Sequence, residues 1–151
     1  MQQYYRKKGR NLGRFARIPF SILNSDAFNV LKPSAVSVYL NMFRQFNGYN
    51  NGYIIYSCRQ AATWANVSAN TASRSLKQLQ EVGLIKCTVK STFNNRKKLA
   101  SEWAFTHEPT VGSKTPSSEW RNFTANPSVK NKGFGINRNT HVFDLKDHIT
   151  R

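Results

Sequence analysis

The stretch "SCRQAATWANVSANTASRSLKQLQEVGLI", residues 57–85, holds two runs with apolar residues at helical spacing and a short interruption between them. Ser57 is a suitable N-cap for a first helix through Ala65, because a serine hydroxyl can accept hydrogen bonds from the free amides of a first turn. The interruption, residues 66–68, predicts a three-residue turn whose last residue, Ser68, caps a second helix in the same way. Gly83 is expected to end that helix, since glycine readily adopts the left-handed conformation found there. The stretch therefore predicts two helices joined by a tight turn.

The second helix is predicted to have one apolar face and one polar face. Ala72, Leu76 and Leu79 recur at helical spacing and should pack on a core. A tight turn before the helix lets it leave the first helix at a steep angle and present its polar face to solvent, as in a helix-turn-helix. Arg suits contacts to guanine or phosphate and Asn suits adenine, so we interpret the polar face as a candidate DNA contact, with a solvated helix face as the alternative. The candidate residues on this helix are Asn70, Thr71, Ser73, Arg74 and Lys77.

Two alternating segments, residues 84–90 and 99–105, follow the helices and predict two strands. The residues expected to share a face within each strand are Ile85, Cys87 and Val89 in the first, and Leu99, Trp103 and Phe105 in the second. The segment between them, STFNNRKK, is rich in turn-forming residues and is predicted to form a basic loop. Its candidate phosphate contacts, for which solubility is the alternative interpretation, are Arg96, Lys97 and Lys98.

The residues before this stretch predict further helices and one strand. Residues 18–31 indicate one or two short helices, and Pro33 suits the first position of a longer helix whose apolar stripe extends to Phe46. Residues 50–52, Asn-Asn-Gly, predict a turn, and the run YIIY at 53–56 is typical of a short strand. We therefore expect an α+β fold that is mainly helical.

Residues 18–106 resemble the winged helix-turn-helix superfamily. The resemblance rests on the stretch quoted above, with its pattern S-x-x-T-x-x-R-x-L-x-x-L followed by x-x-G-L-I, and on the hairpin after it. Together with "LKPSAVSVYL" and "NGYNNGYI" ahead of it, the pattern resembles regulators and replication-initiator-like proteins of bacterial mobile elements. The resemblance implies that the second helix enters the major groove and that the loop at 93–98, a two-stranded basic wing, touches the backbone or the minor groove.

Charge and size limit the class of protein. The 151 residues suit one compact domain, and 23 basic residues against 7 acidic ones give a formal net charge of +16, which favours a polyanionic partner. No apolar run approaches the roughly 18 residues that span a bilayer, and the basic N-terminus lacks the apolar core of a secretion signal. Cys58 and Cys87 are isolated and are expected to be buried thiols in a reducing compartment. We therefore expect a cytoplasmic, nucleoid-associated protein without membrane contact.

The two ends of the chain are expected to differ from the middle. Residues 1–17 hold six basic residues and no acid, which predicts a basic N-terminal arm. The proline, asparagine, serine and threonine content of residues 107–151 predicts a largely irregular tail, although its aromatic residues indicate that parts of it dock on the domain or on a partner. The arm's candidate DNA contacts, for which an incidental charged terminus is the alternative, are Arg6, Lys7, Lys8 and Arg10.

The sequence contains no recognisable catalytic motif. His107, His141 and His148 form no metal-ligand spacing with either cysteine, and the seven acidic residues form no obvious carboxylate cluster. No phosphate-binding Gly-Lys-Ser/Thr loop or nucleophile motif occurs. We expect no enzyme activity, no cofactor, no metal site and no small-molecule ligand.

Three functions remain open at this point. The favoured one is sequence-specific binding of double-stranded DNA by a transcriptional regulator or a replication-initiator-like factor. The alternatives are a non-specific architectural DNA-binding protein and an RNA-binding or ribonucleoprotein scaffold protein. A homodimer on a palindromic site is left open, because the architecture is compatible with one but no heptad seam is visible.

Overall fold

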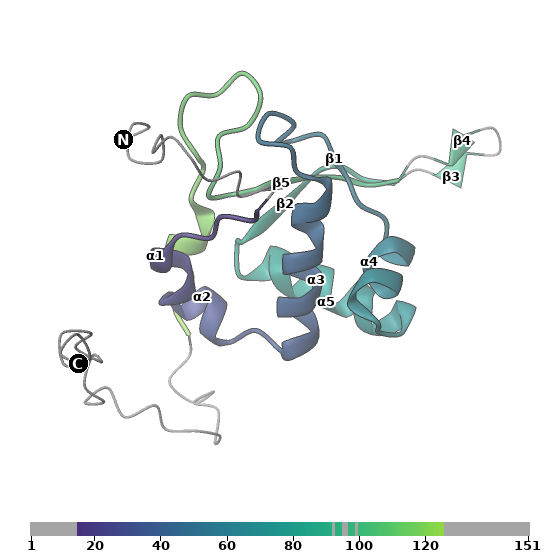
Figure 1. Ribbon diagram of the computed structural model, residues 1–151, viewed down its shortest axis with the longest axis horizontal. Coiled ribbons are helices and arrows are strands. Elements are labelled where there is room, and N and C mark those ends of the chain that lie inside the picture. The colour runs from purple at the N-terminus through teal and green to yellow at the C-terminus, as the bar shows by residue number, and fades with distance from the viewer. Residues whose placement is uncertain (1–14, 92, 95–96, 99, 126–151) are drawn as a thin grey trace, which may run out of the picture.

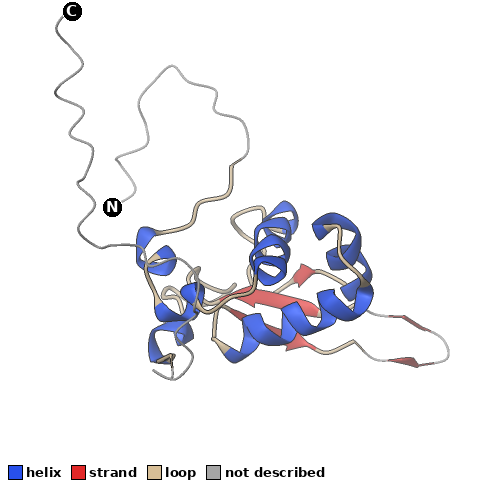
Figure 2. Cartoon of the chain, turned by 90° about the horizontal axis from the view of Figure 1, so that it is seen from below, coloured by secondary structure: helices blue, strands red, loops and turns tan. Residues whose placement is uncertain are grey.

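The computed structural model describes residues 15–91, 93–94, 97–98 and 100–125, drawn in colour in Figure 1. Within these residues the fold is α+β, with helices gathered around a short antiparallel sheet and a separate hairpin extending away from them (Figure 2). The α-helices are α1 (Phe20–Leu23), α2 (Asp26–Asn29), α3 (Pro33–Met42), α4 (Cys58–Ala65) and α5 (Ala69–Glu81), and the 3-10 helices are η1 (Phe43–Gln45) and η2 (Glu119–Asn122). The strands are β1 (Ile54–Ile55), β2 (Ile85–Val89), β3 (Phe93–Asn94), β4 (Lys97–Lys98) and β5 (Glu102–Phe105).

The main sheet has the strand order β1-β5-β2, and both pairings are antiparallel. Trp103 lies in the central strand, opposite Ile54 on one side and Cys87 on the other. A register shift between Cys87 and Val89 turns Val89 away from the core, so that Val89 is 44% exposed. The prediction that Val89 shares the apolar face of Ile85 and Cys87 is therefore wrong, because alternation does not continue through a bulge.

The core is one cluster formed by the inner faces of the helices and the sheet. Helices α3, α4 and α5 contact one another pairwise, and Ala72, Leu76 and Leu79 of α5 are buried between them as predicted. Tyr39 of α3 lies in the middle of an aromatic group, with its ring edge-on to the ring of Phe105 at a centroid distance of 5.5 Å. The burial of these side chains holds α5 against the rest of the domain.

The predicted helices before the sheet are confirmed. Residues 18–31 contain the two short helices α1 and α2, and the Ser25 side chain caps α2 by accepting a hydrogen bond from the Phe28 amide. Pro33 begins α3, and η1 continues it to Gln45. The strand predicted at residues 99–105 is shorter in the structure, where β5 begins at Glu102. Residue 99 lies outside the described residues.

The segment after β5 packs on the core as far as the structure describes it. Trp120 in η2 is only 7% exposed and belongs to the core cluster. The Ser118 amide donates to the Thr106 carbonyl at 2.7 Å, and the Thr106 hydroxyl donates to the Gly83 carbonyl at 2.7 Å. The packed part of the chain therefore extends beyond the boundary predicted at residue 106, and only residues 126–151 of the predicted tail lie outside the described residues.

Asn51 joins the turn before β1 to the end of β5. Its side-chain amide donates to the carbonyls of Phe105 and Glu108 at 2.8 and 2.7 Å, and its side-chain oxygen accepts from the Phe105 amide at 2.7 Å. A buried amide is stable only when its polar atoms find partners, and these three bonds supply them. The sequence predicted a turn at this position but not the role of the side chain.

His107 is a half-buried histidine beside the aromatic group. Its Nδ1 lies 3.2 Å from the Tyr39 hydroxyl oxygen, and its ring lies 5.4 Å from that of Phe105. Burial lowers the pKa of His107 to about 4, and the positive charge of Arg17 adds to the effect. His107 is therefore neutral in the folded protein at neutral pH and has a structural place in the domain.

We expect Gly83→Ala to destabilise the fold more than Gly112→Ala. Both glycines have positive φ, 75° and 86°, so both alanines incur the left-handed penalty of about 1–2 kcal/mol. At position 83 the new Cβ would also lie 2.9 Å from the backbone of Glu119 and Trp120, whereas no atom lies within 4 Å at position 112. The free energy of unfolding in urea should fall at least about 1 kcal/mol further for Gly83→Ala. Equal losses for the two variants would contradict the packing of η2 against Gly83.

We expect the stability of the protein to fall as the pH drops from about 6.5 to about 4. The unfolded state protonates His107 near its ordinary pKa, whereas the folded state resists protonation until its pKa of about 4. The unfolded state therefore binds more protons in this window, and about 3 kcal/mol of stability should be lost through this residue. Urea unfolding at several pH values should show a smaller loss in His107→Phe than in the natural chain, since other titrating groups are common to both. Identical pH dependence would contradict the assignment.

Candidate nucleic-acid interface

Helices α4 and α5 and the turn between them form as the sequence predicts. The Ser57 side chain accepts from the Gln60 amide at 3.1 Å while the Gln60 side chain accepts from the Ser57 amide at 2.9 Å, which completes a capping box. Asn66 has a φ of 52°, and this left-handed residue turns the chain between the helices. The Ser68 side chain then caps α5 by accepting from the Thr71 amide at 3.2 Å.

Hydrogen bonds from its inner side fix the direction of α5. The Gln78 side chain donates to the Val30 carbonyl at 3.1 Å and accepts from the Lys32 amide at 3.3 Å, so it spans the loop before α3. At the other end, the Cys58 thiol donates to the Ala69 carbonyl at 3.2 Å and ties the start of α4 to the start of α5. These contacts orient α5 independently of its outer face.

The outer face of α5 carries the predicted polar residues. Asn70, Ser73, Arg74 and Lys77 are all exposed. Thr71 is half-buried, and its hydroxyl lies 2.9 Å from the Ser68 hydroxyl, so it belongs to the helix cap rather than to the open face.

The two cations of this face differ in their partners. The Lys77 ammonium lies 3.7 Å from the Glu81 carboxylate, one helical turn further on, and both side chains are exposed. Such a surface pair is weak and is easily exchanged for another anion. Arg74 forms no ion pair with any of the described residues. Arg74 is thus the more available of the two for an external anion.

Arg59 is an exposed cation that the sequence interpretation missed. It lies in the first turn of α4, two residues after the capping residue Ser57. The signal was present in the sequence, since Arg59 stands two positions before Ala61, the buried residue of this helix. Arg44, in η1, instead covers the ring of Trp64 at 4.7 Å, and it holds that half-buried tryptophan against the domain.

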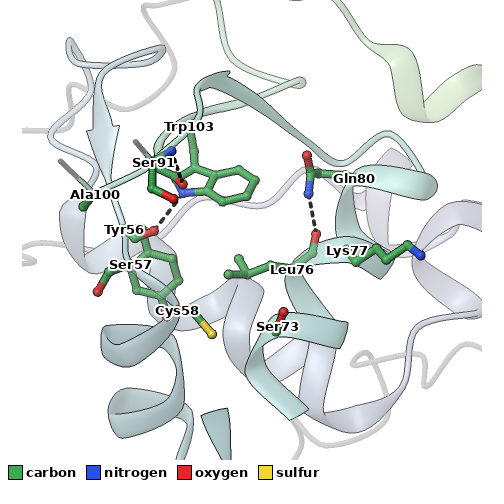
Figure 3. Close-up of a pocket in the computed structure, with 11 residues that line it drawn as sticks. Tyr56, Ser57, Cys58, Ser73, Leu76, Lys77, Gln80, Ser91, Ala100 and Trp103 are labelled. Atoms are coloured by element: carbon green, nitrogen blue, oxygen red, sulfur yellow. Dashed lines mark hydrogen bonds between the residues drawn. The ribbon is translucent and has the colours of Figure 1, made fainter. Parts of the chain in front are cut away.

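A cavity of about 320 Å³ separates the outer face of α5 from the base of the hairpin (Figure 3). It is open to solvent and is lined by several hydroxyl groups, while Leu76 and Trp103 supply apolar surface. Lys77 borders it, but its ammonium points away from the cavity in Figure 3 and lies 3.7 Å from the Glu81 carboxylate. No carboxylate lines it, so the cavity suits an anionic or polar group better than a cation. The lining residues are Tyr56, Ser57, Cys58, Ser73, Leu76, Lys77, Gln80, Ser91, Ala100, Ser101 and Trp103.

Internal hydrogen bonds hold the walls of this cavity. The Trp103 indole donates to the Tyr56 carbonyl at 2.8 Å, and the Ser91 amide donates to the Ser101 hydroxyl at 3.2 Å. Both bonds are drawn in Figure 3. Burial raises the pKa of the Tyr56 phenol to about 12, so this wall stays uncharged at neutral pH.

The predicted basic loop is a hairpin in which Phe93 pairs with Lys98 and Asn94 with Lys97. Figure 1 shows β3 and β4 projecting from the body of the protein. Lys97 and Lys98 lie in strand β4 rather than in a loop, whereas Arg96 lies outside the described residues. The arm candidates also lie outside the described residues; they are Arg6, Lys7, Lys8 and Arg10.

Other kinds of site find little support in the described part of the chain. No group of three His, Cys, Asp or Glu side chains there could hold a metal ion. None of the helices described is long and apolar enough to cross a bilayer.

Comparisons with known proteins give no relative. No family model matches the chain, and neither the curated proteins nor the solved structures contain a significant match. The candidate interface therefore stands on its own geometry.

We expect Ser68→Ala to lower the free energy of unfolding by about 1 kcal/mol, because the Thr71 amide would lose its side-chain acceptor. Ser73→Ala is the matched control, since Ser73 is exposed within the same helix and its loss should change stability little. Urea unfolding measures both variants. A loss at Ser68 no larger than at Ser73 would mean that the side-chain cap does not stabilise α5.

Proposed function

We propose that this chain is a winged helix-turn-helix protein that binds double-stranded DNA, with α5 as the helix that enters the major groove. The observation that carries the proposal is the outer face of α5. This face follows a capped three-residue turn, is exposed, and presents Asn70, Ser73 and Arg74. Its direction is fixed from the inner side of the helix, which leaves these side chains available to a ligand.

The order of the elements supports the proposed fold. Helix α3, strand β1, helices α4 and α5 and strands β2 and β5 follow one another as in a winged helix, and the sheet order β1-β5-β2 brings the last strand to the centre. In this proposal the β3–β4 hairpin is the wing, and Lys97 and Lys98 supply its charge.

The chemistry of the face supports a DNA ligand. A major groove admits one α-helix, where Arg can bind guanine through two hydrogen bonds and Asn can bind adenine. The neighbouring cavity, with several hydroxyl groups in its walls and no carboxylate among its lining residues, could receive a backbone phosphate between α5 and the wing. The net charge of +16 would draw the chain to DNA over long distances. A regulator or a replication-initiator-like factor on the nucleoid would use these properties.

One observation favours a second candidate, a non-specific architectural DNA-binding protein. Of the 23 basic residues in the chain, only Arg74 and Lys77 lie on the outer face of α5. Phosphate contacts from the remaining cations would bind DNA without reading its sequence. The two candidates predict different effects of removing one α5 side chain on the affinity for selected and for random DNA.

We expect Arg74→Ala to weaken binding to a site selected from a random DNA pool by about 1–3 kcal/mol, and to weaken binding to random duplex much less. Lys114→Ala is the control, because Lys114 is also exposed but lies in the segment after β5. It removes the same charge and should affect both duplexes slightly and equally. Affinities measured across a salt series give both comparisons.

Three other results would contradict sequence-specific binding of double-stranded DNA. Equal weakening of both duplexes by Arg74→Ala would favour the architectural protein. Failure of the selection to enrich any sequence would favour it as well. An RNA competitor that displaces the selected duplex at lower concentration than DNA would favour an RNA-binding protein instead.

A further inference from the structure

Strand β1 is an open edge of the main sheet. The sheet order places it outside β5, and no other strand in the described part of the chain pairs with it. Its pairing with β5 continues on both sides, because the Gly52 amide donates to the Trp103 carbonyl and the Tyr56 amide donates to the Ser101 carbonyl, both at 3.2 Å. Since peptide groups alternate in direction along a strand, the Ile55 amide and carbonyl point away from β5. These groups are available to another strand.

This edge lacks charge. Residues 45–58 contain no Asp, Glu, Lys or Arg, although the chain has 30 such residues in 151 (23 basic and 7 acidic). Alternate side chains along the edge are exposed, Tyr53 at 60% and Ile55 at 54%, whereas Ile54 and Tyr56 are buried in the core. Soluble proteins usually protect a sheet edge with lysine, proline, a bulge or a covering segment. Strand β1 is short, pairing over two residues, which limits its exposed edge, but the segment from Tyr53 to Tyr56 holds no lysine or proline and its pairing has no register shift.

The opposite edge of the same sheet is protected in several of these ways. Strand β2 carries Lys86, whose ammonium bonds the Glu119 carboxylate at 2.8 Å, so that η2 lies beside the start of the strand. The register shift between Cys87 and Val89 distorts its end, and the exposed Lys90 follows. The β1 edge thus lacks the charged side chains and the register shift of the β2 edge and is available to a partner strand.

Charge favours a second copy of this chain as that partner. A chain of net charge +16 repels its copies over most approaches, and residues 15–125 contain only five acids. The uncharged β1 edge lets two copies meet without opposing like charges. An edge without cations also offers no phosphate contacts, on which the binding of double-stranded DNA depends.

We propose that β1 pairs antiparallel with β1 of a second copy, which forms a two-fold symmetric homodimer with a continuous six-stranded sheet. The same segment faces itself across such an axis, as an isologous contact requires. The side chains of Tyr53 and Ile55 would line the junction. Glu102 of β5 lies between Ile55 and the exposed Val89 in one row across the sheet, so the apolar surface at the junction is that of Tyr53 and Ile55. This inference does not rest on DNA binding.

Sedimentation of the full chain without DNA tests the proposal, at about 0.3 M salt so that repulsion between the copies is screened. The natural chain should sediment as a dimer over a range of concentrations. Ile55→Lys and Tyr53→Lys should each raise the dimer dissociation constant at least about tenfold, since each places two like charges at the axis. Ser21→Lys, an exposed position on α1, is the control and should remain dimeric. Circular dichroism melting confirms that each variant is folded.

Two results would overturn the proposal. One is a natural chain that stays monomeric up to its highest soluble concentration. The other is a dimer that persists in both edge variants as it does in Ser21→Lys, which would place the contact elsewhere. The test of DNA binding is independent of the test of dimerisation, because Ile55→Lys retains the outer face of α5. Its binding to a single half-site can be measured on the monomer. A dimer with no affinity for DNA would refute only the proposed function.

Discussion

The close contact between Gly83 and the backbone of η2 is the constraint on which much of the domain depends. Gly83 stands between α5 and β2, and the segment after β5 returns to lie against it. Thr106 connects the same three parts, because its hydroxyl donates to the Gly83 carbonyl and its carbonyl accepts from the Ser118 amide. One junction thus determines where α5 ends, where β2 begins and how β5 leaves the sheet. Both ends of α5 are thus fixed, its last turn by the Gly83 junction and its first turn by the Ser68 cap, and this fixes the position of its outer face.

The segment after β5 also shapes the distribution of charge. Its Glu108 pairs with Arg17 at 3.7 Å and its Glu119 pairs with Lys86 at 2.8 Å. These two acids compensate cations away from the outer face of α5, while Arg74 has no ion pair among the described residues. On α5 itself Lys77 shares its charge with Glu81, so Arg74 carries the unpaired positive charge of the outer face.

The parts that could be predicted from the sequence are those set by local signals. The capping residues Ser57 and Ser68 and the left-handed Gly83 placed α4, α5 and the turn between them, since each acts on its own few neighbours. The roles of Asn51 and of the bulge before Val89 were not predicted, because they depend on contacts with residues far away in the sequence. For the same reason the aromatic residues of the tail predicted docking but not its place, which is the core contact of Trp120. The exposed residues of α5 followed from helical periodicity, whereas the cavity beside them needed the strands to be placed as well.

The proposed interfaces are mechanically connected through a few residues of one strand. Ile55, at the proposed dimer junction, stands two positions before Ser57, whose capping box begins α4. The start of α4 is in turn joined to the start of α5 by the bond from the Cys58 thiol to the Ala69 carbonyl. This connection from Ile55 to α5 is short and hydrogen-bonded, so α5 has little freedom to move relative to β1. The β1 junction would therefore set the distance between the two α5 helices of a dimer. A two-fold dimer reads half-sites at a fixed spacing only when its reading helices are held in this way.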